Sequence, residues 1–153
     1  MLFRSANLTA KIKELRAENV LVLSVIGVAG TTESGNIEPL ESIAKVCHEQ
    51  RVHFHVDAAF GGSFLMDSEL RKKLKGIEIA DSVSICAHKQ LYIPIGLSIC
   101  LFKDKDFVHR SENNTRYQAR KGSFDLGRFT VEGSRNFNSL MLHAAFKIAG
   151  REG

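Results

Sequence analysis

Three short runs of β-forming residues constrain the fold of this chain more than any other feature. They cover residues 20–28, 52–56 and 82–86. The segments between them include stretches of helical periodicity that are long enough for crossover connections. Strands that alternate with helices in this way form a mostly parallel sheet with helices on its faces, so the sequence predicts an α/β fold.

The other elements are predicted from periodicity and from chain breakers. Residues 20–28 are almost wholly apolar, which is typical of a strand buried on both faces. A strand over 95–102 is expected to be antiparallel, because the link before it is too short for a helical crossover. Helices are expected over 7–18 with Asn7 as a cap, over 67–75 and over roughly 134–149. A further helix is expected to start near Pro39 and to turn four residues inward: Leu40, Ile43, Ala44 and Cys47.

Composition is typical of one globular domain of 153 residues, with 44% hydrophobic and 25% charged residues. The net charge of +4 is modest and dispersed, which does not favour a nucleic-acid partner. The chain shows no run long enough to span a bilayer and no signal-peptide pattern, so we expect no membrane association.

The three cysteines are odd in number and lack the spacing of metal ligands, so we expect free thiols in a reducing cytoplasm. His53 and His55 alternate with Phe54 on a predicted strand, and neither has the company of metal ligands elsewhere in the sequence. The pattern therefore does not indicate a zinc site, and no metal is expected.

Polar side chains follow two of the predicted strands. Asp57 comes directly after the second strand, and His88 and Lys89 come just after the third. Ligands of α/β proteins bind at the carboxyl ends of strands. An acid and an amine in these places suit pyridoxal phosphate (PLP), which needs an amine for its aldehyde and an acid for its ring nitrogen.

Each of these residues also has a plainer interpretation. Lys89 would be a solvated lysine after a strand, Asp57 a cap of the next turn, and His88 a histidine satisfied within the core. Small neighbours of Asp57 favour the cofactor interpretation, because a flat ring needs room. Ala59 could lie against such a ring, and the glycines at 61–62 would relieve backbone crowding.

Taken together, the motifs resemble the group II PLP-dependent amino-acid decarboxylases, which include glutamate, aromatic amino-acid, histidine and diaminobutyrate decarboxylases. The resemblance covers essentially the whole chain and implies the aspartate-aminotransferase-like fold, fold type I. The motifs that carry it are residues 30–32, 55–62, 80–82, 88–89, 133–135 and 150–153.

The resemblance implies a role for each candidate residue. Lys89 would be the lysine that carries the cofactor, and Asp57 the partner of its pyridine nitrogen. Ala59 would pack on one face of the ring, His88 would contact phosphate or substrate, and Thr32 would line the cofactor site. These roles make Lys89 and His88 the expected catalytic residues of this part of the chain.

The resemblance also implies a mobile loop at 109–126 that closes over the substrate, with Tyr117 as its candidate proton donor. The stretch 88–96 looks closest to bacterial glutamate- and aspartate-type members, so an acidic amino acid is the expected substrate. Another fold-type-I reaction, such as that of an aldehyde-lyase or a desulfurase, stays open.

Members of this family are much longer than 153 residues. Their phosphate-binding loop lies upstream of the matching region and their small domain lies downstream. We therefore expect residues 1–153 to be the C-terminal part of the large PLP-binding domain of a homodimeric enzyme. Alone, this part would expose sheet edges and an apolar surface, and it could be inactive.

Overall fold

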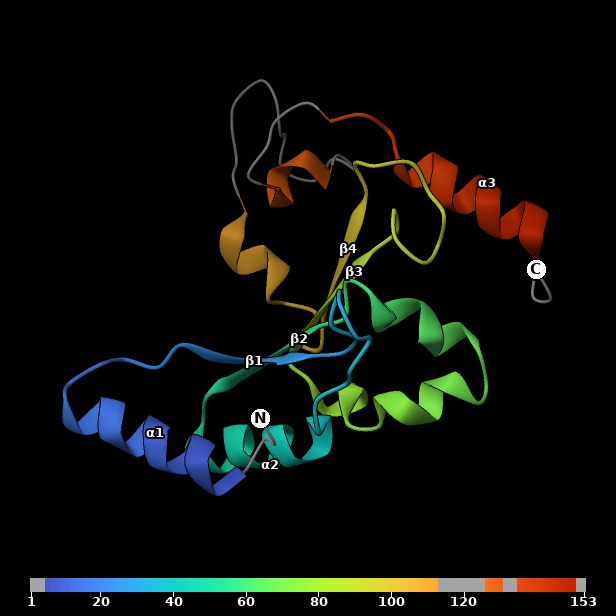
Figure 1. The fold of residues 1–153 in the computed structure, drawn as a ribbon. Helices are drawn as coiled ribbons and strands as arrows, with labels where there is room; N and C mark the ends of the chain where they lie inside the picture. The colour runs from blue at the N-terminus through green and yellow to red at the C-terminus, as the bar shows by residue number, and fades with distance from the viewer. Residues whose placement is uncertain (1–4, 113–125, 131–134, 151–153) are drawn as a thin grey trace. The chain divides into compact units, whose positions relative to one another are not determined.

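The computed structural model describes residues 5–112, 126–130 and 135–150 (Figure 1). The chain divides between Lys103 and Asp104 into two compact units, and each is described by itself. The elements of the first unit are α1 (Ser5–Ala17), β1 (Ser24–Val28), α2 (Leu40–Gln50), β2 (His53–Asp57), the 3₁₀ helices η1 (Gly61–Met66), η2 (Leu70–Leu74) and η3 (Ile77–Ile79), β3 (Ser82–Cys86) and β4 (Ser98–Phe102).

The first unit is built on a four-stranded sheet with the order β1-β2-β3-β4. The first three strands are parallel, with Asp57 in register with Val28 on one side and Ser84 on the other. β4 runs antiparallel to β3, as the short link between them predicts. The predicted α/β fold with a mostly parallel sheet is therefore confirmed, and the three parallel strands all end at one edge.

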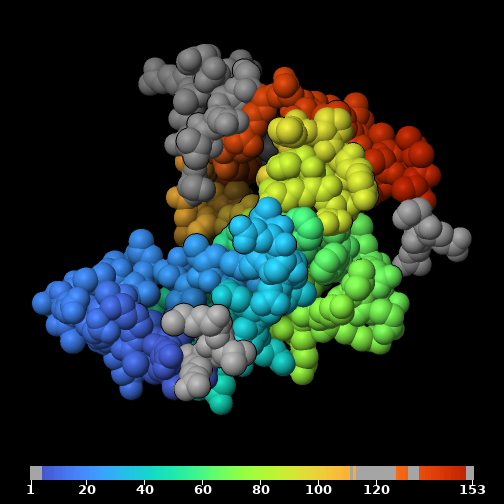
Figure 2. Space-filling model, in the orientation of Figure 1, coloured from blue at the N-terminus to red at the C-terminus, as the bar shows by residue number. Residues whose placement is uncertain are grey.

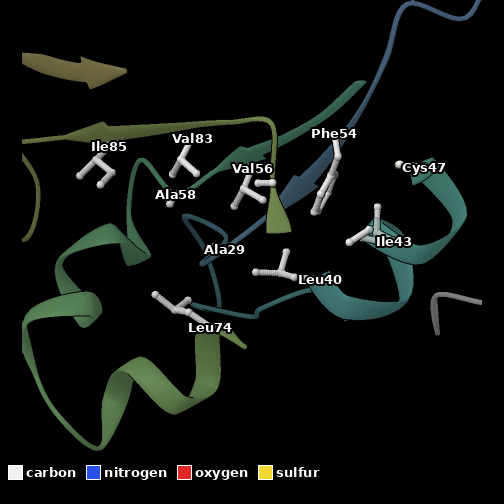
Figure 3. Packing of buried hydrophobic residues seen from close by; sticks show 12 residues of the cluster. Ala29, Leu40, Ile43, Cys47, Phe54, Val56, Ala58, Leu74, Val83 and Ile85 are labelled. Carbon is white, nitrogen blue, oxygen red and sulfur yellow. The ribbon is translucent and has the colours of Figure 1, made fainter. Parts of the chain in front are cut away.

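The core lies between one face of this sheet and α2. Pro39 precedes the helix, and the predicted inward positions of α2 are all buried. Figure 3 shows Leu40 and Ile43 of α2 pointing toward Phe54 and Val56 of β2. Phe54 is 2% exposed, and burying a side chain of this size contributes about 1.5–3 kcal/mol relative to leaving it in water.

β1 differs from the prediction. It begins at Ser24 instead of residue 20, and its side chains are not buried on both faces. Leu23 is 74% exposed and Ile26 is 59% exposed. The physical reason is that β1 is the outermost strand of the described sheet, and α2 covers only one of its faces.

Two smaller predictions also need correction. α1 begins at Ser5, so Asn7 lies inside the helix instead of capping it. The expected helix over 67–75 is replaced by the 3₁₀ helix η2, which ends at Leu74, the residue whose side chain is fully buried against the core. The glycine at position 76, with φ at +101°, then turns the chain toward η3.

The second unit contains η4 (Val108–Ser111), η5 (Leu126–Phe129) and α3 (Ser139–Ala149). Arg128 bridges η5 to the chain after η4 through an ion pair with Glu112 at 3.4 Å. No residue of α3 is buried, although its sequence is strongly apolar. Of the helices in the described residues, none has both the length and the apolar character needed to cross a bilayer.

Candidate active site

The candidate site lies at the carboxyl edge of the parallel strands. β1, β2 and β3 end there at Val28, Asp57 and Cys86. The three loops that follow are tied together by backbone hydrogen bonds: Ala29 N–H donates to Asp57 O at 2.8 Å, and Cys86 N–H donates to Ala59 O at 3.3 Å. Residues far apart in the sequence are thereby brought to one edge.

Asp57 is half-buried at the end of β2. Its Oδ1 accepts a hydrogen bond from the backbone N–H of Ala59 at 3.0 Å. The predicted turn-capping role is therefore present, and it also orients the carboxylate at the sheet edge. One carboxylate oxygen is held by the backbone, so a ligand at this edge would meet an acid of fixed orientation.

Glycines allow the loops after β1 and β2 to approach closely. Gly61 N–H donates to Ala29 O at 3.0 Å, and a Cβ on Gly61 would collide with that same oxygen. A Cβ on Gly62 would lie 2.7 Å from the side chain of Ile85. In Figure 2 the sky-blue atoms of the loop after β1 lie next to green atoms from a later part of the first unit. The expected relief of crowding by these glycines is confirmed.

The loop after β1 carries the two candidate threonines. Thr31 is half-buried, and its Oγ1 lies 2.7 Å from Ser34 Oγ and accepts from Asn36 N–H at 3.1 Å. These contacts are those of a turn-forming hydroxyl. Thr32 is exposed, so its side chain lies at the surface of the same loop, and a role toward a cofactor stays a prediction.

His88 and Lys89 lie in the segment that joins β3 to β4. This segment is closed by hydrogen bonds from Ala87 N–H to Leu97 O and from Ile93 N–H to Ala87 O, both at 3.1 Å. His88 Nδ1 lies 3.4 Å from Leu97 O. Lys89 is half-buried. The amine is thus carried by a pinned loop at the edge where Asp57 lies.

The structure brings five of the six predicted site residues to this edge: Thr32, Asp57, Ala59, His88 and Lys89. The sixth, Tyr117, lies outside the described residues, as does most of the predicted loop 109–126. In the described part of the chain, no group of three or more histidine, cysteine and acidic residues could hold a metal ion.

Sequence reasoning missed a hydrogen-bonded row on the sheet face opposite the core. This His–Ser row consists of His53 and His55 of β2 with Ser82 and Ser84 of β3. His53 Nε2 and His55 Nδ1 each lie 2.8 Å from Ser82 Oγ, and His55 Nε2 lies 3.2 Å from Ser84 Oγ. The sequence signal that could have indicated this row is the spacing of two residues between the histidines of one strand and between the serines of the next.

Two surface hollows are lined by other residues. One, of about 500 Å³, is formed by residues 34–42 with Lys73 and Lys75, and another, of about 640 Å³, lies beside α2 and Ile79. Neither is lined by Asp57 or Lys89, so the hollows are not the candidate site.

Comparison with known protein families identifies one match over the whole chain. The family profile described as "Pyridoxal-dependent decarboxylase conserved domain" matches residues 1–153. Among curated proteins, aspartate 1-decarboxylase of Aliivibrio fischeri is 46% identical over 147 residues, covering 96% of this chain and 27% of that protein. L-2,4-diaminobutyrate decarboxylase of Acinetobacter baumannii is 32% identical over 143 residues, covering 90% and 28%. The chain thus spans less than a third of the length of these relatives.

Solved structures show the same fold. A crystal structure of mouse CSAD matches with a TM-score of 0.89 and 32% identity, covering 99% of this chain and 33% of that one. A structure of Oryza sativa TDC with PLP and tryptamine matches with a TM-score of 0.88 and 26% identity, covering 98% and 32%. In both comparisons the likeness extends over nearly all of residues 1–153.

Proposed function

The chain belongs to the pyridoxal-dependent decarboxylase family, and from this premise we propose that the intact protein uses PLP to decarboxylate an amino acid. The observation that carries the proposal is the pairing of an acid and an amine at one sheet edge. Asp57 ends β2, and Lys89 follows the neighbouring strand β3. Residues 1–153 would form the C-terminal part of the large PLP-binding domain.

The donor set at this edge fits the cofactor. Lys89 offers an amine for covalent attachment to the aldehyde, and Asp57 offers a carboxylate to keep a proton on the ring nitrogen. When bound, PLP supplies an electron sink for the pair released as carbon dioxide leaves. Asp57 is already oriented by the Ala59 N–H, so its carboxylate needs little rearrangement to hold that proton.

Other residues are proposed to line the cofactor site beside Asp57 and Lys89. Ala59, small and half-buried, would lie against the ring. His88 would contact the phosphate or the substrate, and Thr32 would line the cofactor site. Tyr117 is proposed as the proton donor of a closing loop over 109–126.

An acidic amino acid is the proposed substrate, with aspartate ahead of glutamate. The support is the 46% identity to an aspartate 1-decarboxylase, against 32% to the diaminobutyrate enzyme of Acinetobacter baumannii. Removal of the 1-carboxylate from aspartate leaves β-alanine and carbon dioxide. Both products can be measured directly, so the substrate class is testable without a coupled reaction.

A homodimer in the cytoplasm, with no nucleic-acid or membrane partner, is also proposed. The exposed apolar side chains of α3 support association, because a large apolar patch in water marks an interaction surface. Ile148 is 87% exposed and Leu140 is 54% exposed. Three free cysteines support a reducing compartment. Light scattering of the intact protein will give its oligomeric state.

The direct test is covalent labelling of the intact protein. After incubation with PLP and reduction with borohydride, we expect a pyridoxyl label on the peptide that contains Lys89, found by mass spectrometry. Lys89→Ala should lose the label and at least a thousandfold of kcat, about 4 kcal/mol of transition-state stabilisation. Lys75→Ala, which alters a lysine paired with Glu41 on the surface, is the matched control. A label that persists in Lys89→Ala would overturn the assignment.

Product analysis then distinguishes the reaction classes. Aspartate, glutamate, 2,4-diaminobutyrate and tyrosine are supplied separately, and carbon dioxide and amine products are quantified. Fastest release from aspartate or glutamate is expected. Fastest release from tyrosine or a basic amino acid contradicts the substrate proposal. Cleavage to an aldehyde or loss of sulfide would show another PLP reaction on the same fold.

A further inference from the structure

The segment that carries Lys89 contains a residue in a strained conformation. Tyr92 has a φ of +55°, in the left-handed region. Among the described residues other than glycine, only Asn19 and Arg51 also have a positive φ. Asparagine adopts this conformation readily, and Arg51 caps the end of α2, where left-handed residues are common. Tyr92 has neither reason, so its conformation needs another one.

The side chain of Tyr92 does not provide that reason. The residue is 90% exposed, so packing of its ring within the described part of the chain offsets little of the strain. A bulky side chain at positive φ raises the free energy of the folded state, because its Cβ lies close to the following carbonyl oxygen. The compensation therefore comes from what the backbone of Tyr92 does for the neighbouring residues.

The residue that follows Tyr92 is buried and hydrogen-bonded. Ile93 is 6% exposed, and its N–H donates to Ala87 O at 3.1 Å. Tyr92 N–H donates to Lys89 O at 3.3 Å. The first bond closes a loop around residues 88–92, and the second closes a turn inside that loop. The left-handed conformation of Tyr92 turns the chain back, so that Ile93 reaches both its acceptor and its buried position.

The burial of Ile93 offsets the strain at Tyr92. An aliphatic side chain removed from water releases more free energy than one left-handed residue costs. Ala87, at the other end of the closed loop, is itself fully buried. Leu91 of the same turn packs against the core. Lys89 therefore has buried anchors before and after it in the chain.

We propose that Tyr92 and Ile93 are positioning residues for Lys89. The left-handed turn at Tyr92 places Ile93 in its buried position, and buried Ile93 holds the backbone from which the amine extends. The role of Tyr92 is one of backbone conformation, which glycine or asparagine can provide and a β-branched residue cannot. The consequence for catalysis rests on the proposed function, in which Lys89 carries the cofactor.

The first experiment tests the turn without PLP. Amide hydrogen exchange of the intact protein is followed by mass spectrometry of the peptide that covers residues 87–97. Tyr92→Gly and Tyr92→Asn should exchange within about twofold of the wild-type rate, because both residues tolerate positive φ. Tyr92→Val should exchange about tenfold faster, because local opening frees the amides of residues 92 and 93. Equal exchange in Tyr92→Gly and Tyr92→Val overturns the proposal.

The second experiment measures the amine itself. The intact protein is mixed with PLP, samples are reduced with borohydride at timed intervals, and the labelled fraction of the Lys89 peptide is measured. Tyr92→Gly should be labelled as fast as the wild type. Tyr92→Val should be labelled about tenfold more slowly, because the reacting group is displaced. Ile93→Ala, which removes the anchor and keeps Tyr92, should slow the labelling in the same way.

The same variants are then compared as catalysts at saturating PLP. Tyr92→Val should lower kcat about tenfold with little change in KM, since the change displaces the amine and removes no contact with the substrate. Tyr92→Gly should keep the wild-type kcat. If Tyr92→Gly lost as much as Tyr92→Val, the ring of Tyr92 and not its backbone conformation would be what matters, and the proposal would be wrong.

A second left-handed residue that precedes a buried one provides matched controls. Arg51 has a φ of +51°, and Val52, directly before β2, is 5% exposed. Arg51→Val and Val52→Ala should lower the melting temperature about as much as Tyr92→Val and Ile93→Ala, by roughly a few degrees. They should leave the labelling of Lys89 and kcat unchanged. Equal slowing by both pairs of variants would indicate general destabilisation and would overturn the proposal.

Failure of this inference and failure of the proposed function give different results. If the wild type takes no label from PLP, the proposed function fails, while the exchange experiment still decides whether the turn at Tyr92 holds the segment. If the wild type is labelled at Lys89 and Tyr92→Val and Ile93→Ala are labelled equally fast, the proposed function stands and the positioning role is wrong.

Discussion

Gly61 shows how a single residue sets the distance between two loops at the sheet edge. Its amide N–H donates to Ala29 O at 3.0 Å, and an added methyl group would collide with that oxygen. Gly61→Ala should therefore destabilise the fold by about 3 kcal/mol, at the upper end for overpacking because the obstacle is backbone. Urea unfolding followed by circular dichroism will measure the loss.

Gly35→Ala is the control for that experiment. It lies in the loop after β1 with φ at +67°, and an added Cβ would meet no atom within 4 Å. Its cost is that of backbone conformation alone, about 1 kcal/mol. If Gly61→Ala lowered the free energy of unfolding no more than Gly35→Ala does, the result would contradict the close approach of the two loops.

At the scale of elements, Asp67 fixes the chain between η1 and η2. Its Oδ1 accepts from the backbone N–H groups of Leu70 at 2.7 Å and Glu69 at 2.8 Å. These two hydrogen bonds, that of Leu70 first, lower the pKa of the Asp67 carboxyl from its ordinary value of 3.8. Hydrogen bonds to the ionised form favour that form, so the charge contributes to stability when it is present.

The sign of the resulting pH dependence is fixed. A carboxyl whose pKa is lowered by folding stabilises the fold above the unfolded value, and that contribution is lost as pH falls through the folded value. Asp67→Asn should therefore be less stable than the wild type at pH 7, and the difference should close below about pH 4. Melting curves between pH 7 and pH 3 will test this, with Glu33→Gln as a control. A constant difference across that range contradicts the prediction.

The elements themselves were predictable where one physical signal dominated. α2 was expected from the spacing of Leu40, Ile43 and Cys47, and β4 was expected to be antiparallel from a short link. Boundaries were less predictable. The apolar run from residue 20 enters the sheet only at Ser24, because apolar character indicates burial but not which neighbour provides it.

The candidate site was predictable in part for a similar reason. Asp57 and Lys89 follow apolar strands, a pattern that places both at one sheet edge. The His–Ser row was not predictable as a unit, because its hydrogen bonds depend on the register of β2 against β3. Sequence gives the alternation of polar side chains, but only pairing shows which histidine meets which serine.

At the scale of the whole molecule, Cys47 reports on the integrity of the core. It is 1% exposed, and burial, with a further contribution from the charge of Asp81, raises the pKa of its thiol from 9.0 to about 11. Thiolates are the reactive form. At pH 8 we expect iodoacetamide to label exposed Cys100 in the native protein and Cys47 only after unfolding, as mass spectrometry of each peptide will show.

The same thiol predicts an alkaline loss of stability. Because folding raises its pKa, the contribution of Cys47 is fully present below pH 9 and is lost as pH rises from 9 to about 11. Cys47→Ala leaves a small cavity and lowers stability at pH 7, but it should remove this part of the alkaline slope. Native labelling of Cys47 as fast as that of Cys100 would contradict the described core.

The pinned segment between β3 and β4 has a consequence for amine chemistry at the site. Its hydrogen bonds from Ala87 to Leu97 and from Ile93 to Ala87 close the loop that carries Lys89. A tethered group acts at a high effective concentration, of order millimolar for a flexible link and far higher when well oriented. A free amine added to Lys89→Ala would thus have to reach at least that concentration to replace the lysine. In the proposed function, the short loop that holds Lys89 would provide the cofactor site with an amine at an effective concentration that a free amine in solution does not easily reach.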